Sequence, residues 1–202
     1  MPSRRQRLAG AAHDVAPMLL GGQISSRVGT DLVVVRITEV EAYGGVGEDP
    51  GSHAFRGQTA RNATMFGPAG HAYIYFTYGM HWCTNVVTGP SGSASAVLIR
   101  AGEVIEGIDI ARERRPSATA DRDLARGPAR LSVALGLTGA LDGVDLLDPD
   151  SSVRLSLPRT PMPVAVTGPR TGVSGDGALT PWRFATDHPT VSPYRPASRR
   201  TS

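Results

Sequence analysis

The chain has 202 residues, of which 40% are hydrophobic, and this is enough for one globular domain with a substantial core. All 21 basic residues are arginines, so a lyase that works through a lysine Schiff base is excluded, apart from one using the N-terminal amine. A single cysteine, Cys83, excludes an internal disulfide. No apolar run approaches a membrane span and no signal peptide is recognisable, so we expect a cytoplasmic protein.

The net charge of +3 is carried by the two ends of the chain. Residues 1–30 contain four Arg and one Asp, and residues 183–202 contain the same numbers, so the middle has a net charge of −3. A basic protein is compatible with a polyanionic partner, but this distribution is not a uniform nucleic-acid-binding stripe. We expect residues 1–10 and 186–202 to be flexible tails of a single domain.

The first elements are a predicted helix from Ala11 to Leu20 and a strand from Gln23 to Val28. A second strand, Asp31 to Tyr43, is rich in β-branched residues and contains no Pro or Gly. Because strand side chains alternate, Glu39 and Glu41 are expected on one face, together with Val35, Ile37 and Tyr43. Two carboxylates there indicate either a partnered site or an edge strand with one exposed end.

A segment with most of the aromatic residues follows. Eight of the eleven aromatic side chains and three of the five histidines lie between Tyr43 and Trp82. A glycine-rich stretch, 44–52, leads to His53. The run from His71 to Val87 predicts a hairpin interrupted at Gly79 and Met80, with Tyr73 and Tyr75 on one face.

The rest of the chain predicts further strands and helices. We expect a strand at Ala94–Arg100, helices at Glu103–Arg115 and from Pro128 to Gly136, and short strands at Val153–Leu157 and Val164–Thr167. The order of elements favours an α+β fold, with a curved, mostly antiparallel sheet, surrounding helices and a protruding aromatic β-hairpin. No internal repeat, phosphate-binding glycine loop or Cys/His metal cluster is present in the sequence.

Several motifs occur in an order that resembles the alkyladenine DNA glycosylase family, also called the 3-methyladenine DNA glycosylases. They are Glu-x-Glu-Ala-Tyr from Glu39, the downstream His53, Gln-Thr-x-Arg-Asn from Gln58, Met65-Phe66, Tyr-x-Tyr-x-x-Tyr-Gly-Met from Tyr73, Asn85, and Val-Leu-Ile-Arg-Ala from Val97. The resemblance extends from about Leu19 to about Arg183. Part of the expected α+β architecture is also implied by this resemblance.

The resemblance implies base excision repair chemistry. Its expected reaction is hydrolysis of the N-glycosidic bond of an alkylated, and also deaminated, purine that has been flipped out of damaged double-stranded DNA, which leaves an abasic site. Glu41 matches the general base and Arg100 the arginine that orients it, whereas Glu39 matches a second carboxylate that we interpret as structural. No metal or other cofactor is expected. A monomer is expected, associated with the nucleoid through its DNA substrate.

The resemblance also assigns substrate contacts. Tyr43, His53 and Tyr75 match residues that sandwich the flipped base, and aromatic faces attract a cationic alkylated purine. Asn85 matches the residue that excludes an exocyclic amino group at the purine 2-position. Tyr78 matches the side chain that intercalates into the duplex, with Met80 as its support.

Two other functions remain open from the residues. A binding module of this fold would recognise damaged DNA without cutting it, but would have no chemical need for Glu41 and Arg100. A hydrolase of free nucleosides would have no evident use for Tyr78 at a hairpin tip. The glycine-rich stretch before His53 and the sparse basic loops depart from the family pattern, and the second departure predicts DNA binding that depends strongly on salt.

Overall fold

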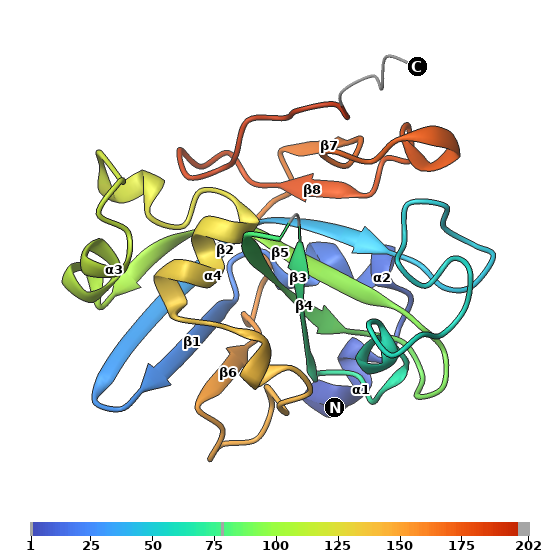
Figure 1. The fold of residues 1–202 in the computed structure, drawn as a ribbon, viewed down its shortest axis with the longest axis horizontal. Coiled ribbons are helices and arrows are strands. Elements are labelled where there is room, and N and C mark those ends of the chain that lie inside the picture. The colour runs from blue at the N-terminus through green and yellow to red at the C-terminus, as the bar shows by residue number, and fades with distance from the viewer. Residues whose placement is uncertain (1, 78, 198–202) are drawn as a thin grey trace.

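The computed structural model describes residues 2–77 and 79–197. Its centre is an antiparallel sheet of eight strands (Figure 1). Six of them lie in the order β3-β4-β5-β2-β1-β6, while β8 pairs with β2 and β7 pairs with β8. The strands are β1 (Gln23–Val28), β2 (Asp31–Tyr43), β3 (Ala72–Thr77), β4 (His81–Val87), β5 (Ala96–Glu106), β6 (Val153–Ser156), β7 (Val166–Gly168) and β8 (Arg183–Ala185).

Short helices surround this sheet, and the α+β prediction is confirmed. The α-helices are α1 (Arg4–Leu8), α2 (Ala12–Val15), α3 (Ile108–Arg114) and α4 (Pro128–Leu135). In the part of the chain that the structure describes, five 3-10 helices lie at Ala16–Leu19, Ala63–Phe66, Asp121–Asp123, Gly139–Leu141 and Gly175–Gly177. The predicted helix from Ala11 is divided into α2 and the first of these 3-10 helices, because Pro17 cannot donate a backbone hydrogen bond within a helix.

Strand β2 is central in the sheet. It pairs with β1 through its first half, with β5 along nearly its whole length, and with β8 from Glu39 to Glu41. Both carboxylates are fully buried. The interpretation of this run as an edge strand with an exposed end is therefore wrong, because neighbouring strands cover β2 on both sides.

The expected face of β2 is also wrong, because the strand contains irregularities. Its register against β5 shifts between Ile37 and Glu39, and again between Glu39 and Val40. A bulge changes the phase of side-chain alternation. As a result, Val35 and Ile37 belong to the hydrophobic core, whereas Glu39, Glu41 and Tyr43 point to the opposite side of the sheet.

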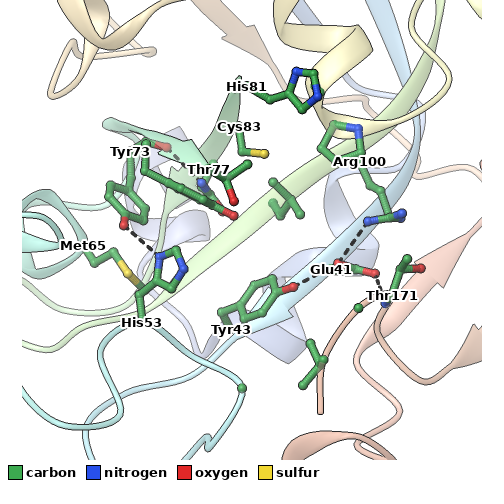
Figure 2. A pocket seen from close by; sticks show the side chains of 18 of the residues that line it. Glu41, Tyr43, His53, Met65, Tyr73, Thr77, His81, Cys83, Arg100 and Thr171 are labelled. Carbon is green, nitrogen blue, oxygen red and sulfur yellow. Dashed lines mark hydrogen bonds and ion pairs between the residues drawn. The ribbon is translucent and has the colours of Figure 1, made fainter. Parts of the chain in front are cut away.

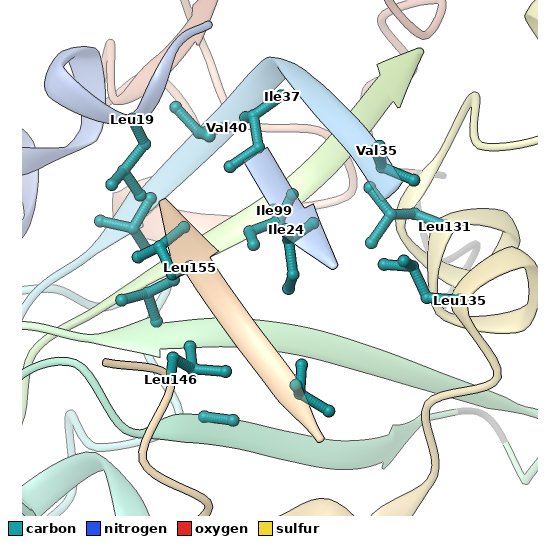
Figure 3. Packing of buried hydrophobic residues seen from close by; sticks show 14 of the residues in the cluster. Leu19, Ile24, Val35, Ile37, Val40, Ile99, Leu131, Leu135, Leu146 and Leu155 are labelled. Carbon is teal, nitrogen blue, oxygen red and sulfur yellow. The ribbon is translucent and has the colours of Figure 1, made fainter. Parts of the chain in front are cut away.

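The main core lies on one side of the sheet, against α2 and α4. It combines the inward side chains of β1, β2, β5 and β6 with leucines of α4 and of the N-terminal helical segment (Figure 3). Its labelled members are Leu19, Ile24, Val35, Ile37, Val40, Ile99, Leu131, Leu135, Leu146 and Leu155. Helix α4 begins at Pro128 and ends at Gly136, as predicted, and packs on β4 and β5. This core fixes the strands that carry the cavity described below.

The predicted helix from Glu103 is wrong over its first turn. Strand β5 continues through Val104 to Glu106, because these residues pair with β2, and α3 begins only at Ile108. Gly107 has a left-handed backbone (φ 73°), which ends the strand and starts the helix.

Both terminal segments make ordered contacts with the domain. Residues 4–8 form α1, and a capping box between Ser3 and Gln6 satisfies backbone amides at its N-terminus. At the other end, Thr190 and Ser192 are buried, so the segment expected to be a loose tail from residue 186 packs against the sheet as far as residue 192. Strand β8 was not predicted, because three residues are too few for an alternation pattern.

The hairpin of β3 and β4 agrees with the sequence prediction in its strands. Tyr73 pairs with Asn85 and Tyr75 pairs with Cys83 in its register. Met80, in the turn, is 68% exposed. The intercalating residue expected at position 78 lies outside the described residues. Among the described residues, no helix is both long and apolar enough to cross a bilayer.

A first prediction concerns Gly102 in β5. A Cβ atom at this position would lie 2.3 Å from Val35 Cγ1 and 2.4 Å from the carbonyl oxygen of Arg36, beside the irregular register of β2. Because one of these contacts is backbone, the strand must shift. We expect Gly102→Ala to lower the free energy of unfolding by roughly 1–3 kcal/mol, measured by urea denaturation. Gly29→Ala is not a suitable control because Gly29 has a positive φ, whereas Gly168→Ala meets no atom within 4 Å and isolates the steric effect.

Candidate active site

A cavity of about 490 Å³ opens on the face of the sheet opposite the main core. It is lined by β2, β3, β4 and β5, by the loops after β2 and β7, and by the start of α4. Six of the eight predicted site residues line it, and Figure 2 shows several of them. They are Glu41, Tyr43, His53, Tyr75, Asn85 and Arg100.

Glu41 is held by three groups from different parts of the chain (Figure 2). The backbone amide of Thr171 donates to Oε1 at 2.7 Å, and the Tyr43 hydroxyl donates to Oε2 at 3.0 Å. Arg100 Nη1 lies 3.5 Å from Oε2. The carboxylate is thus fixed in position in the wall of the cavity.

Burial raises the pKa of Glu41 above its usual value. Arg100, the Thr171 amide and the Tyr43 hydroxyl act in the opposite direction, since each favours the ionised carboxylate. The pKa of Tyr43 is raised well above its ordinary value, by burial and then by the nearby charge of Glu41. Tyr43 therefore stays a hydrogen-bond donor at neutral pH, and Glu41 combines raised basicity with fixed geometry.

Arg100 joins the two buried carboxylates of β2. Its Nε lies 3.2 Å from Glu39 Oε1 and donates to Ser192 Oγ at 3.1 Å. Glu39 also accepts from Arg183 Nε at 2.6 Å and from the Ser192 amide at 2.7 Å. Glu39 thus has two hydrogen-bond donors and an ion pair with Arg100, does not line the cavity, and anchors the arginine that reaches Glu41.

Aromatic rings form the wall next to Glu41. The rings of His53 and Tyr75 meet edge to face, with centroids 4.5 Å apart, and Tyr73 stacks on Tyr75 at 5.3 Å. His53 Nδ1 is 3.0 Å from the Tyr73 hydroxyl. Burial, and then the charge of Arg61, lower the pKa of His53, so its imidazole is neutral at neutral pH. Burial raises the pKa of Tyr73 to about 12, and this hydroxyl also stays protonated.

Polar side chains complete the floor of the cavity. Asn85 Nδ2 donates to the Tyr73 carbonyl oxygen at 2.9 Å, which fixes the orientation of the amide. Cys83 lies beside it on β4, and burial raises the pKa of its thiol to about 11, so it is not a reactive thiolate at neutral pH. Met80 does not line the cavity.

Sequence reasoning missed several residues around the cavity. Thr171 contributes only its backbone amide, and a backbone contact has no sequence signature. Arg61 lies within the Gln-Thr-x-Arg-Asn motif, and its guanidinium is 5.8 Å from the centroid of Tyr75. The buried ion pair of Asp49 with Arg170 joins loops 121 residues apart, so no local pattern marks it. Within residues 2–77 and 79–197, no group of three or more His, Cys, Asp or Glu side chains could hold a metal ion.

The chain is similar over most of its length to proteins of one family. Residues 6–190 match the sequence model of the family described as "Methylpurine-DNA glycosylase (MPG)". A protein of Streptomyces avermitilis named "Putative 3-methyladenine DNA glycosylase" is 55% identical over 99% of this chain and 96% of its own length. Proteins with the same name from Leifsonia xyli subsp. xyli (53% identical, 98% of this chain, 95% of the relative) and Burkholderia lata (49%, 86% and 82%) are also similar. The chain therefore belongs to the methylpurine-DNA glycosylase family, which makes it a hydrolase of N-glycosyl bonds that acts on alkylated bases of DNA.

Proposed function

We propose that the protein is a monofunctional glycosylase that flips alkylated and deaminated purines out of duplex DNA and hydrolyses their N-glycosidic bond. The product is an abasic site left for other enzymes. The observation that supports this most is Glu41, a buried carboxylate with a raised pKa, held next to an aromatic cavity. N-glycoside hydrolysis needs such a group, because a water must be deprotonated and a cationic sugar stabilised.

In this proposal Glu41 acts on the attacking water while Arg100 holds the carboxylate in place. The Thr171 amide occupies one lone pair of Oε1 and leaves the other for water, whereas the Tyr43 hydroxyl and Arg100 both contact Oε2. The negative charge of Glu41 also favours the oxocarbenium-like transition state electrostatically. Bond cleavage then needs no covalent intermediate with the protein.

The damaged base occupies the aromatic part of the cavity. The rings of Tyr43, His53 and Tyr75 line it, and a cation is attracted to such ring faces. A neutral His53 does not repel a cationic alkylated purine, and its lowered pKa supports this role. Asn85, whose amide is fixed by Tyr73, excludes an amino group at the purine 2-position and so disfavours normal guanine.

Extrusion of the base is assigned to the hairpin turn. Tyr78 is proposed on the family motif alone as the residue that fills the space left in the duplex. Met80 supports it, and the 68% exposure of Met80 in the turn is compatible with contact to DNA. Strands β3 and β4 pair up to Thr77 and His81, on either side of this turn.

The test is release of hypoxanthine and of 3-methyladenine from duplex DNA under single-turnover conditions. We expect free base and an intact abasic strand, with no strand cleavage, since the chain contains no lysine for a lyase step. The same damaged nucleosides, free in solution, form the comparison arm. Equal rates on duplex and free nucleoside would contradict base flipping, and binding without release would leave only recognition of damaged DNA.

A further prediction concerns pH. Glu41 is a base only when ionised, so the rate should fall as pH decreases through its raised pKa. The Tyr43 hydroxyl lowers that pKa, and Tyr43→Phe should therefore move the acid midpoint to higher pH while the ring still stacks. The measurement is the pH profile of 3-methyladenine release. The substrate is suitable because the positive charge of the alkylated nucleotide does not titrate in this range.

Tyr73→Phe is the matched control for this profile. It removes a hydroxyl from the same cavity, but that hydroxyl contacts His53 and not Glu41. Its midpoint should equal that of the intact protein, whatever its rate. If both variants shift the midpoint equally, the acid limb does not report Glu41.

A further inference from the structure

The strongest unassigned feature is the ion pair of Asp49 and Arg170. Arg170 is 0% exposed and Asp49 1%. Two hydrogen bonds join them, from Nη1 to Oδ2 at 2.5 Å and from Nη2 to Oδ1 at 2.6 Å. Burial opposes ionisation of Asp49, but the bonds from Arg170 and two backbone amides outweigh it and lower the pKa. Because desolvating two charges is costly, the burial of an ion pair is weak evidence that the pair stabilises the fold.

On one side the guanidinium of Arg170 supports the aromatic wall. Its central carbon lies 4.7 Å from the centroid of the Tyr43 ring and 5.4 Å from that of Trp182. Arg170 does not line the cavity, whereas Tyr43 does. Nη1 also donates to the carbonyl oxygen of Ala42 at 2.9 Å. Arg170 therefore backs the ring of Tyr43 and holds the backbone immediately before it.

On the second side Arg170 controls the position of the general base. Thr171, the next residue, donates its backbone amide to Glu41 Oε1 at 2.7 Å, as Figure 2 shows. Gly172 and Val173 continue along the edge of the cavity. Any displacement of Arg170 is transmitted through one peptide unit to the bond that holds Glu41.

On the third side Asp49 organises the glycine-rich loop before His53. Its carboxylate accepts from the amides of Gly44 and Gly51, each at 2.9 Å. Gly51 lines the cavity, and a Cβ atom there would come 2.6 Å from Arg170 Nη2. The close approach of the guanidinium thus requires a glycine at position 51. His53 follows two residues later in the same loop.

We propose that Asp49 and Arg170 are positioning residues for catalysis, which together set the Glu41 hydrogen bond, the Tyr43 ring and the loop that carries His53. This inference rests on the proposed function, because it assigns Glu41 and the aromatic wall their roles. The alternative is that the pair only stabilises the fold. The two differ in one respect: a stabilising pair can be replaced by neutral groups without loss of rate in the folded protein.

The test is the double variant Asp49→Asn/Arg170→Met. Removing both charges leaves no uncompensated buried ion, and such replacements are often neutral or stabilising. The matched control is Asp145→Asn/Arg5→Met. Arg5 Nη2 lies 2.6 Å from Asp145 Oδ2, Asp145 also caps the amide of Leu147, and neither residue lines the cavity. Both variants receive the same two substitutions. In both pairs the carboxylate accepts a backbone amide and the guanidinium donates to a backbone carbonyl oxygen, although the control pair is partly exposed.

Three quantities are measured for each protein: the melting temperature, the single-turnover rate of 3-methyladenine release, and the acid midpoint of its pH profile. The midpoint reports the pKa of Glu41, which the substitutions alter through the Thr171 amide and through the position of the Tyr43 hydroxyl. The residues around Glu41 are not substituted in either variant: Arg100, Tyr43, Glu39, Tyr75 and Cys83.

We expect the Asp49/Arg170 variant to fold. Its rate should fall by roughly 10²-fold, because a displacement of a catalytic group by about 1 Å can have an effect of this size. Its acid midpoint should lie at higher pH than that of the intact protein. The control should keep the rate and the midpoint of the intact protein. A folded Asp49/Arg170 variant with normal rate and midpoint overturns the inference. So does a variant that does not fold, because the inference requires that neutral groups can replace the pair in the folded protein. An inactive intact protein would instead contradict the proposed function, which separates the two failures.

Discussion

Glu41→Gln should lower the single-turnover rate of 3-methyladenine release by roughly 10²–10⁴-fold, the usual contribution of a general base. Glutamine has the same shape and keeps one acceptor oxygen for the Thr171 amide or the Tyr43 hydroxyl, but it cannot take a proton from water. The cavity should therefore remain intact. Binding to duplex DNA that contains a stable abasic-site analogue should be nearly unchanged, which a binding titration at fixed salt measures.

The stability of this variant is part of the prediction. Burial raises the pKa of Glu41, so the folded protein bears a cost for the ionised carboxylate at neutral pH. Removing that charge should leave the melting temperature equal or a few degrees higher. Glu103→Gln is the control. Glu103 does not line the cavity, and its carboxylate lies 3.0 Å from Arg36 in a partly exposed ion pair. If Glu41→Gln releases 3-methyladenine as fast as Glu103→Gln does, Glu41 is not the general base.

The second large effect is expected at Glu39. Glu39→Ala should lower the free energy of unfolding by about 3–5 kcal/mol, because removing one partner of a buried ion pair leaves an uncompensated charge. Arg183, at 2.6 Å, loses its carboxylate partner, and Arg100, at 3.2 Å, keeps only its longer contact of 3.5 Å with Glu41. The amide of Ser192 also loses its acceptor. For a domain of this size the melting temperature should fall by roughly 10 °C.

Urea denaturation and thermal melting measure this loss, with Glu103→Ala as the comparison. That substitution breaks a pair of which Glu103 is 36% and Arg36 42% exposed, and exposed pairs contribute less than about 1 kcal/mol. Equal destabilisation by the two variants would show that Glu39 is not the centre of a buried network. Adding Arg183→Met to Glu39→Ala should recover part of the loss, since it removes the buried charge that Glu39 no longer compensates.

The sequence by itself determined much of the fold and of the cavity's composition. The β-branched run to Tyr43 predicts β2 at its observed bounds, and the aromatic run interrupted at Gly79 predicts β3 and β4. Proline and glycine mark the two ends of α4. These predictions depend on local propensity and backbone conformation, which neighbouring residues decide. The ordered motifs further predict six of the residues that line the cavity.

The tertiary structure decided which face each strand presents and what holds the carboxylates. The bulges in β2 turn Glu39 and Glu41 away from the core, although strict alternation places them with Val35 and Ile37. Pairing with β2 extends β5 into the expected helix. Arg170 approaches Asp49 and Tyr43 across more than 120 residues of chain. Bulges, strand partners and buried ion pairs all arise from contacts between distant segments, and such contacts leave no periodic pattern in the sequence.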